Sequence, residues 1–234
     1  MKFRYLMLLV SLSAINIFSQ PVFKNPGLPS SFTFELSEYF DPVVKYDTTK
    51  ISVSQKEKNG TKYFHIFVNE GNKFTTEMEI NYTDLTTISE KRVDLSNNTV
   101  VESFSHNKNQ ILFYNKAKNV NLNVKTDEKN IYSPYGFLIS FSGFPFEKEK
   151  GVTIKSYIYE YGDVLTMKVT NLGKQKVSVK AGSFECYKLE LAVGGWQSMF
   201  ASQKSYLYFT VAVPTILSNT KKKMIMANGM QTNW

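Results

Sequence analysis

The stretch KISVSQKEKNGTKYFHIFV, residues 50–68, decides the fold of this chain. Its apolar residues alternate with polar ones on both sides of an Asn59-Gly60 pair. Alternation with a period of two is typical of a β-strand with one buried face. Asparagine and glycine both tolerate the positive φ that a primed hairpin turn requires. The stretch therefore predicts two antiparallel strands joined by a tight turn.

Similar runs fill the chain on either side of this hairpin. No proline occurs from residue 43 to 133, and short runs rich in Val, Ile, Thr, Tyr and Phe alternate there with Asn, Gly, Asp and Lys clusters. The second half returns to the same rhythm in KSYIYEYG, VSVKAGSFECYKLEL and KSYLYFTVAV. Consecutive strands joined by tight turns indicate antiparallel pairing. We expect an all-β fold, with a curved, mostly antiparallel sheet that forms an open or partial barrel.

One segment, residues 134–143, departs from the strand pattern. Ser133 is a suitable cap and Pro134 suits the first helical position. The apolar residues that fall at helical spacing are Phe137, Leu138, Phe141 and Phe144. The pattern predicts a short helix that fills one end or one face of the sheet. A buried loop rich in phenylalanine is the alternative.

The two ends of the chain differ from its middle. Residues 1–19 combine two basic residues, an apolar run and a small residue at the cleavage position, which is the pattern of a secretory signal peptide. An uncleaved anchor is the alternative, but the apolar run is shorter than the roughly 20 residues that a span needs. We expect an extended leader at 20–31, a single β domain at 32–214 and an irregular tail at 215–234. The mature protein is then exported, periplasmic or extracellular, with no membrane span and no lipid anchor.

The tail contains lysine and methionine clusters without a period. Where a further strand is expected after Pro214, a one-base shift of the reading frame, with suitable synonymous codons, yields an alternating strand and an Asp-Asn-Gly turn. Residues 215–234 are therefore interpreted as a segment that a frameshift has altered, and a native irregular tail is the alternative.

The formal net charge of +8 does not indicate a nucleic-acid-binding protein. Five positive charges belong to Lys2, Arg4 and the tail lysines 221–223, so the rest of the chain carries about +3. The remaining lysines are dispersed, as on a solvated surface, and do not form a phosphate-binding stripe. We expect no nucleic-acid partner.

The single cysteine, Cys186, lies in a strand-like run and has no evident chemical partner. A reactive thiol needs a base or a positive neighbourhood, and neither His65 nor His106 stands in a recognisable relation to it. No metal, phosphate or nucleophile motif occurs in the chain. We expect a packing role for Cys186, no catalytic residue, no metal site and no cofactor. Gly182, in the preceding turn, is expected to adopt a positive φ.

Tyrosines occur at every second position in two of the predicted strands, so they share one face of each strand. Candidate ligand-binding residues are therefore Tyr157, Tyr159, Tyr161, Tyr206 and Tyr208. A curved sheet can pack its aliphatic face as core and turn a tyrosine-lined concave face towards a ligand, the helix or another protein. Cross-strand aromatic pairs that only stabilise the sheet are the alternative.

The turn and strand AGSFECYKLEL, followed by the aromatic strand YLYFTVAVP and preceded by GFPFEKEKG, resemble a known family. It is the bacterial family of exported domains called domain-of-unknown-function family 3108, and the resemblance is clearest over residues 137–214. The resemblance implies an all-β, curved antiparallel sheet in the cell envelope, and it transfers no catalytic residue. A broad likeness to half-barrel lipid carriers exists at the level of fold alone.

These observations favour a non-enzymatic exported envelope protein. Its concave aromatic sheet face is expected to bind a lipid, another apolar or amphipathic ligand, or a partner segment. The alternative is a hydrolase or lyase whose carboxylates are assembled only in the fold. Two acids with a histidine in one cleft would favour that alternative.

Overall fold

The computed structural model describes residues 23–37, 48–107, 109–158, 163–179, 182–195 and 204–211. The expected signal peptide and the expected tail lie outside these residues. The first sheet contains β1 (Ser31–Ser37), β2 (Thr48–Lys58), β3 (Thr61–Glu70), β4 (Phe74–Asn81), β5 (Thr87–Asp94), β6 (Thr99–Asn107), β7 (Gln110–Asn115) and β8 (Val120–Lys125). The second contains β9 (Ile131–Tyr132), β10 (Gly151–Ile158), β11 (Asp163–Val179), β12 (Gly182–Val193) and β13 (Lys204–Thr210).

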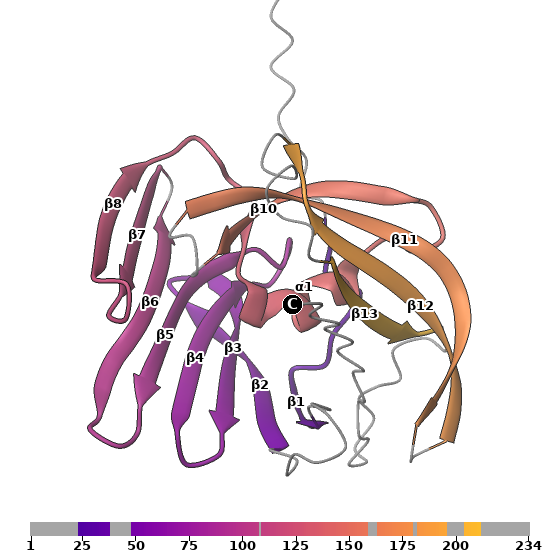
Figure 1. Cartoon of the computed structure of the whole chain (residues 1–234), viewed down its shortest axis with the longest axis horizontal. Helices are drawn as coiled ribbons and strands as arrows, with labels where there is room; N and C mark the ends of the chain where they lie inside the picture. The colour runs from indigo at the N-terminus through magenta and orange to yellow at the C-terminus, as the bar shows by residue number, and fades with distance from the viewer. Residues whose placement is uncertain are drawn as a thin grey trace, which may run out of the picture.

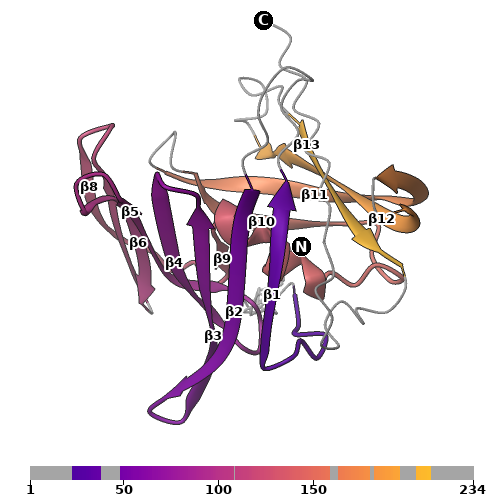
Figure 2. The ribbon, with the colours of Figure 1, turned by 90° about the horizontal axis from the view of Figure 1, so that it is seen from below.

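The strands form two sheets that curve around a short helical segment (Figure 1). The first is an antiparallel meander in which β1 to β8 follow one another in sequence order. The second has the order β13-β12-β11-β10-β9, and its β9–β10 pair is parallel. Figure 2 shows the same two sheets from below, with β8 and β12 at opposite sides of the molecule. The all-β, mostly antiparallel, barrel-like fold expected from the sequence is confirmed, with its strands divided between two sheets.

Two turns have the backbone expected from the sequence. Asn59 and Gly60 have φ values of 51° and 75° and join β2 to β3, where Lys58 pairs with Thr61. This geometry fits a primed two-residue turn, which matches the twist of the two strands. Gly182 has a φ of 131°, as predicted, at the start of β12.

The predicted helical segment is present over residues 134–143. It consists of η1 (Pro134–Gly136), α1 (Phe137–Ser140) and η2 (Phe141–Gly143). Ser133 occupies the N-cap position, but its side chain makes no capping bond. The hydroxyl donates to the Glu90 carboxylate on β5 instead, so the expected capping role was wrong. Glu90 is buried, so its carboxyl group needs such a hydrogen bond to offset its lost hydration.

The main core lies between the two sheets, around the helical segment. Phe137, Leu138 and Phe141 pack there against apolar residues from β1 to β4 and from β10 to β13. Phe23, from the expected leader, is fully buried, with ring centroids 4.9 Å from Tyr132 and 5.1 Å from Phe141. The described part of the leader therefore belongs to the core, although residues 23–30 have no regular secondary structure.

A smaller apolar cluster lies under β6 and β7. It contains Phe104, Ile111, Phe113, Ile131 and Tyr157. Ile131 and Tyr157 come from the second sheet, so this cluster is a further contact between the sheets. None of the helices in the described ranges has the length and apolar character needed to cross a membrane.

The leader approaches the helical segment most closely at Gly143. A Cβ atom at this position would lie 2.3 Å from the Lys24 carbonyl oxygen and 2.8 Å from Leu85 Cδ1. We expect Gly143→Ala to lower the free energy of unfolding by about 3 kcal/mol, because the backbone must shift. Gly194→Ala is the matched control, since its Cβ would come no closer than 3.4 Å to any neighbour. Equal urea-unfolding midpoints for the two variants would contradict this packing.

Candidate functional site

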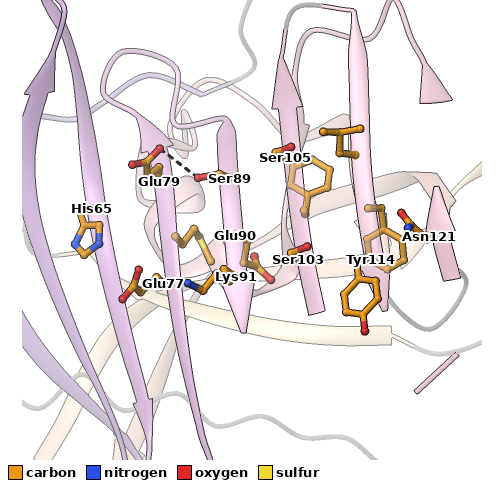
Figure 3. A pocket seen from close by; sticks show the side chains of 14 residues that line it. His65, Glu77, Glu79, Ser89, Glu90, Lys91, Ser103, Ser105, Tyr114 and Asn121 are labelled. Carbon is orange, nitrogen blue, oxygen red and sulfur yellow. Dashed lines mark hydrogen bonds between the residues drawn. The ribbon is translucent and has the colours of Figure 1, made fainter. Parts of the chain in front are cut away.

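A groove with a volume of about 510 Å³ crosses the outer face of the eight-stranded sheet. Figure 3 shows its polar side chains, contributed by β3 to β8. The groove is lined by His65, Glu77, Met78, Glu79, Ser89, Glu90, Lys91, Ser103, Phe104, Ser105, Leu112, Phe113, Tyr114 and Asn121. Four of these residues are buried and alternate along their strands with the outward-facing ones, so they form the floor of the groove: Met78, Glu90, Phe104 and Phe113.

The outward-facing residues of the groove stand in two cross-strand rows. One row runs through His65, Glu79, Ser89, Ser105 and Leu112. The other runs through Glu77, Lys91, Ser103, Tyr114 and Asn121. Successive residues in such a row are side-chain neighbours, about 5 Å apart at Cβ. The short serines in the middle of both rows leave a trough between longer side chains at either end.

The two ends of the trough differ chemically. At the β3–β4 end, His65 stands opposite Glu79, which accepts a 3.2 Å hydrogen bond from Ser89 Oγ. Glu77 stands opposite Lys91, and cross-strand pairs of opposite charge stabilise a sheet. At the β7–β8 end, Tyr114 and Leu112 alternate with buried Phe113 on β7, so both side chains project from the outer face. The groove therefore offers charged acceptors at one end, hydroxyls in the middle and an apolar surface at the other end.

The inner face of β5 also carries charge. Glu90 is 2% exposed and accepts a hydrogen bond from Ser133 Oγ, while the Ser133 backbone N–H donates to Thr87 Oγ1 at 2.9 Å. A buried carboxylate is costly unless hydrogen bonds compensate its lost hydration. These bonds attach the start of the helical segment to β5.

Arg92, two residues further along β5, is the centre of a second set of inner contacts. Its Nη2 lies 2.6 Å from Glu70 Oε2, and its Nη1 lies 3.5 Å from Glu102 Oε2. Nη1 also donates to the Tyr135 hydroxyl at 2.8 Å, and the guanidinium carbon lies 4.1 Å from the centroid of the Phe74 ring. The arginine thus connects β3, β5 and β6 to the helical segment.

Burial and neighbouring charges act together on this cluster. Burial alone lowers the pKa of Arg92, but Tyr135, Glu70 and Glu102 outweigh burial and raise the pKa above its ordinary value. Burial also raises the pKa of the Tyr135 hydroxyl. Arg92 therefore stays cationic and Tyr135 stays neutral at any physiological pH. The cluster suits a structural role, because its charges are already paired within the protein.

The structure does not bring the candidate tyrosines together on a concave face. Tyr157 is 2% exposed and packs its ring 4.1 Å from that of Phe113, measured between centroids. Tyr206 and Tyr208 lie on the face of β13 opposite the core residue Leu207, so they point away from the helical segment. Tyr159 and Tyr161 lie outside the described residues. The three described tyrosines therefore do not form one concave face, because Tyr157 is buried between the sheets whereas Tyr206 and Tyr208 point outward.

The two tyrosines on β13 already interact with charged neighbours. Lys188 Nζ lies 4.3 Å from the Tyr206 ring centroid and 5.8 Å from that of Tyr208. The Tyr206 hydroxyl donates to Glu190 at 3.2 Å, and Lys204 Nζ lies 3.1 Å from the same carboxylate. These contacts support the sheet across strands, as in the alternative, but the partners of both tyrosines are charged and not aromatic.

Cys186 is buried, with 5% of its surface exposed. Burial, followed by the charge of Glu185, raises the pKa of its thiol. A raised pKa disfavours the thiolate that nucleophilic or redox chemistry needs. The packing role expected for Cys186 fits this environment. Among the described residues, no group of three or more His, Cys, Asp or Glu side chains could hold a metal ion.

Sequence reasoning missed the groove and gave Glu77 and Glu79 no weight. The available signal was the β5 stretch Ser89-Glu90-Lys91-Arg92, which carries charge on both parities. An antiparallel strand with one buried face normally keeps its charges on the other. The groove is also lined by three acids and a histidine, a composition that would favour the alternative enzyme class.

Comparison with known proteins identifies a family. Residues 30–221 match the model of the family described as protein of unknown function (DUF3108). No curated protein matches the chain significantly. Among solved structures, the chain is similar to the crystal structure of a beta-barrel-like protein of domain of unknown function DUF1849 from Brucella abortus. That similarity has 11% identity and a TM-score of 0.39, and it covers 70% of this chain and 71% of that chain.

Arg92 and its neighbour Lys91 allow a matched test of the two faces of β5. We expect Arg92→Met to lower the free energy of unfolding by about 3 kcal/mol, because partly buried carboxylates lose their cation. Lys91→Met, on the outer face, should change it by less than about 0.5 kcal/mol. Urea denaturation followed by far-ultraviolet circular dichroism measures both. Similar losses for the two variants would contradict the assignment of Arg92 to the structural cluster.

Proposed function

We propose that this chain, which belongs to the DUF3108 family of proteins of unknown function, is a non-enzymatic binding protein that holds an amphipathic, hydroxyl-rich ligand in the outer groove. An oligosaccharide is the ligand class that best fits this description. The observation that carries the proposal is the pair of cross-strand rows, with serines between an acidic end and an apolar end.

The chemistry of the groove complements a sugar. Carboxylate oxygens of Glu77 and Glu79 can accept hydrogen bonds from ligand hydroxyls, and Ser103 and Ser105 can both donate and accept. The ring of Tyr114 offers an apolar surface with a polar tip, which suits the C–H face of a pyranose. The volume of about 510 Å³ lies within the range of ligand sites.

An apolar carrier has less support. The concave side of both sheets packs on the helical segment, whose residues Phe137, Leu138 and Phe141 are at most 9% exposed. A lipid chain in this position would have to displace close-packed side chains, which is costly. We therefore retain the amphipathic ligand expected from the sequence, but we propose that it binds on the outer face of the sheet and not on the concave one.

We place the protein in the cell envelope. The support is the basic, apolar and small-residue pattern of residues 1–19, which is typical of a secretory signal peptide. An envelope location would also expose the groove to glycans outside the cytoplasm.

A glycoside hydrolase is the second candidate, and the position of His65 opposite Glu79 favours it. Glu77 and Glu79 share a strand face, which places their Cα atoms about 7 Å apart. Carboxyl groups of inverting glycosidases are separated by a comparable ~6.5–9.5 Å. Against this candidate, both carboxylates project from one strand in the same direction, whereas a glycosidase needs them on opposite sides of the scissile bond.

Filling the trough tests the binding proposal. We expect the native protein to retain a subset of oligosaccharides on a printed array of bacterial and neutral glycans. Ser103→Trp should reduce that signal at least tenfold, because the indole occupies the trough. Thr153→Trp, an exposed position on β10 in the other sheet, should leave the signal unchanged. Retention by Ser103→Trp, or no retained glycan at all, would contradict the proposal.

Mass spectrometry of a retained glycan separates the two candidates. Recovery of intact glycan after prolonged incubation supports binding without turnover. Cleaved product that disappears in Glu77→Gln or Glu79→Gln supports the hydrolase instead.

A further inference from the structure

Strand β8 forms one edge of the eight-stranded sheet. Among the described residues, it pairs with β7 alone. All of its residues after Val120 are exposed, including the apolar side chains of Leu122 at 38% and Val124 at 45%. An exposed edge strand with apolar side chains is a template for pairing with another strand.

The sequence of β8 is complementary to itself. Val120-Asn121-Leu122-Asn123-Val124 reads the same in both directions. Residues that stand opposite one another in an antiparallel pair project from the same face of the sheet. A two-fold axis normal to the sheet, placed at Leu122, therefore sets Leu122 against Leu122, Asn121 against Asn123 and Val120 against Val124.

We propose that β8 pairs antiparallel with β8 of a second copy of this chain, about a two-fold axis at Leu122. The pairing brings the valines and leucines of the two copies side by side as one apolar strip on one face of the sheet. On the other face it places asparagine amides opposite one another, where they can exchange hydrogen bonds. Lys125 falls opposite Asn119, so no like charges meet in this register.

The residue order of β8 favours a second copy of this chain over an unrelated peptide. A generic strand would gain main-chain hydrogen bonds from the edge, but it would have no reason to match the Val-Asn-Leu-Asn-Val order. A second copy matches every position by symmetry, as isologous interfaces do. A register shifted by two residues loses the match, because it places Leu122 opposite Val124 or Val120 and leaves part of the palindrome without its counterpart.

The pairing would also affect the groove. Asn121 lines the groove at its β8 end. Because the two-fold axis is normal to the sheet, the grooves of both copies lie on the same face of one continuous sheet. Asn123 of the second copy then stands beside Asn121, so the two grooves meet across the axis.

Multi-angle light scattering after size-exclusion chromatography tests the pairing. At about 100 µM, where a micromolar Kd leaves most chains paired, the native protein should have the mass of a dimer. Leu122→Lys places two like charges at the axis and should give a monomer that keeps the far-ultraviolet circular dichroism spectrum of the native protein. Leu172→Lys, at an apolar β11 residue that is 49% exposed, should remain a dimer. A monomeric native protein, or a dimeric Leu122→Lys, overturns the proposal.

A cross-link tests the position of the axis. Residues directly opposite in an antiparallel pair have Cα atoms about 4.5–5.5 Å apart, which is within the range for a disulfide. In a Cys186→Ser background, Leu122→Cys should form a covalent dimer on mild oxidation, and Leu172→Cys should not. A native dimer in which Leu122→Cys fails to cross-link would place the interface elsewhere and refute β8 pairing.

Discussion

The contact between Glu90 and Ser133 is the constraint on which the rest of the structure depends. The carboxylate is almost fully buried on the inner face of β5, and the serine begins the helical segment that fills the space between the sheets. Such a carboxyl group is tolerated because it is hydrogen-bonded, and removal of the Ser133 hydroxyl would take away part of that compensation. The helical segment is thereby held at one position on the sheet. The hydrogen bond from Arg92 to the Tyr135 hydroxyl attaches it at a second position.

The two residues before Ser133 join the chain to the second sheet. Ile131 and Tyr132 form β9, which pairs with β10, and Ser156 Oγ donates to the Tyr132 carbonyl at 2.8 Å. The concave sides of both sheets are therefore occupied by the protein's own side chains. Any ligand must then be sought on an outer face, where the serines of β5 and β6 leave the groove. The alternation of β5, with Glu90 and Arg92 inside and Ser89 and Lys91 outside, separates the structural contacts from the surface available for binding.

Much of the fold could be predicted from the sequence, because it depends on local signals. The Asn59-Gly60 turn, the strand alternation and the helical spacing of Phe137 and Phe141 each act within a few residues. The site could not be predicted in the same way. Glu77, Ser103 and Tyr114 become neighbours only through the register of four strands, and register is a long-range property. Tyr157 failed as a ligand candidate for the same reason, since Phe104 and Phe113, which bury it, come from the other sheet.

A double-mutant cycle on Glu90 and Ser133 tests the central claim most directly. The free energy of unfolding is measured in urea for Glu90→Met, Ser133→Ala and the double variant. Each single change removes this hydrogen bond and leaves one of its two buried polar groups in place, whereas the double change removes both groups. The account predicts that the double variant is more stable than additivity allows, by about 1–3 kcal/mol. Additive losses, within about 0.5 kcal/mol, would mean that the contact does not hold the helical segment on the sheet.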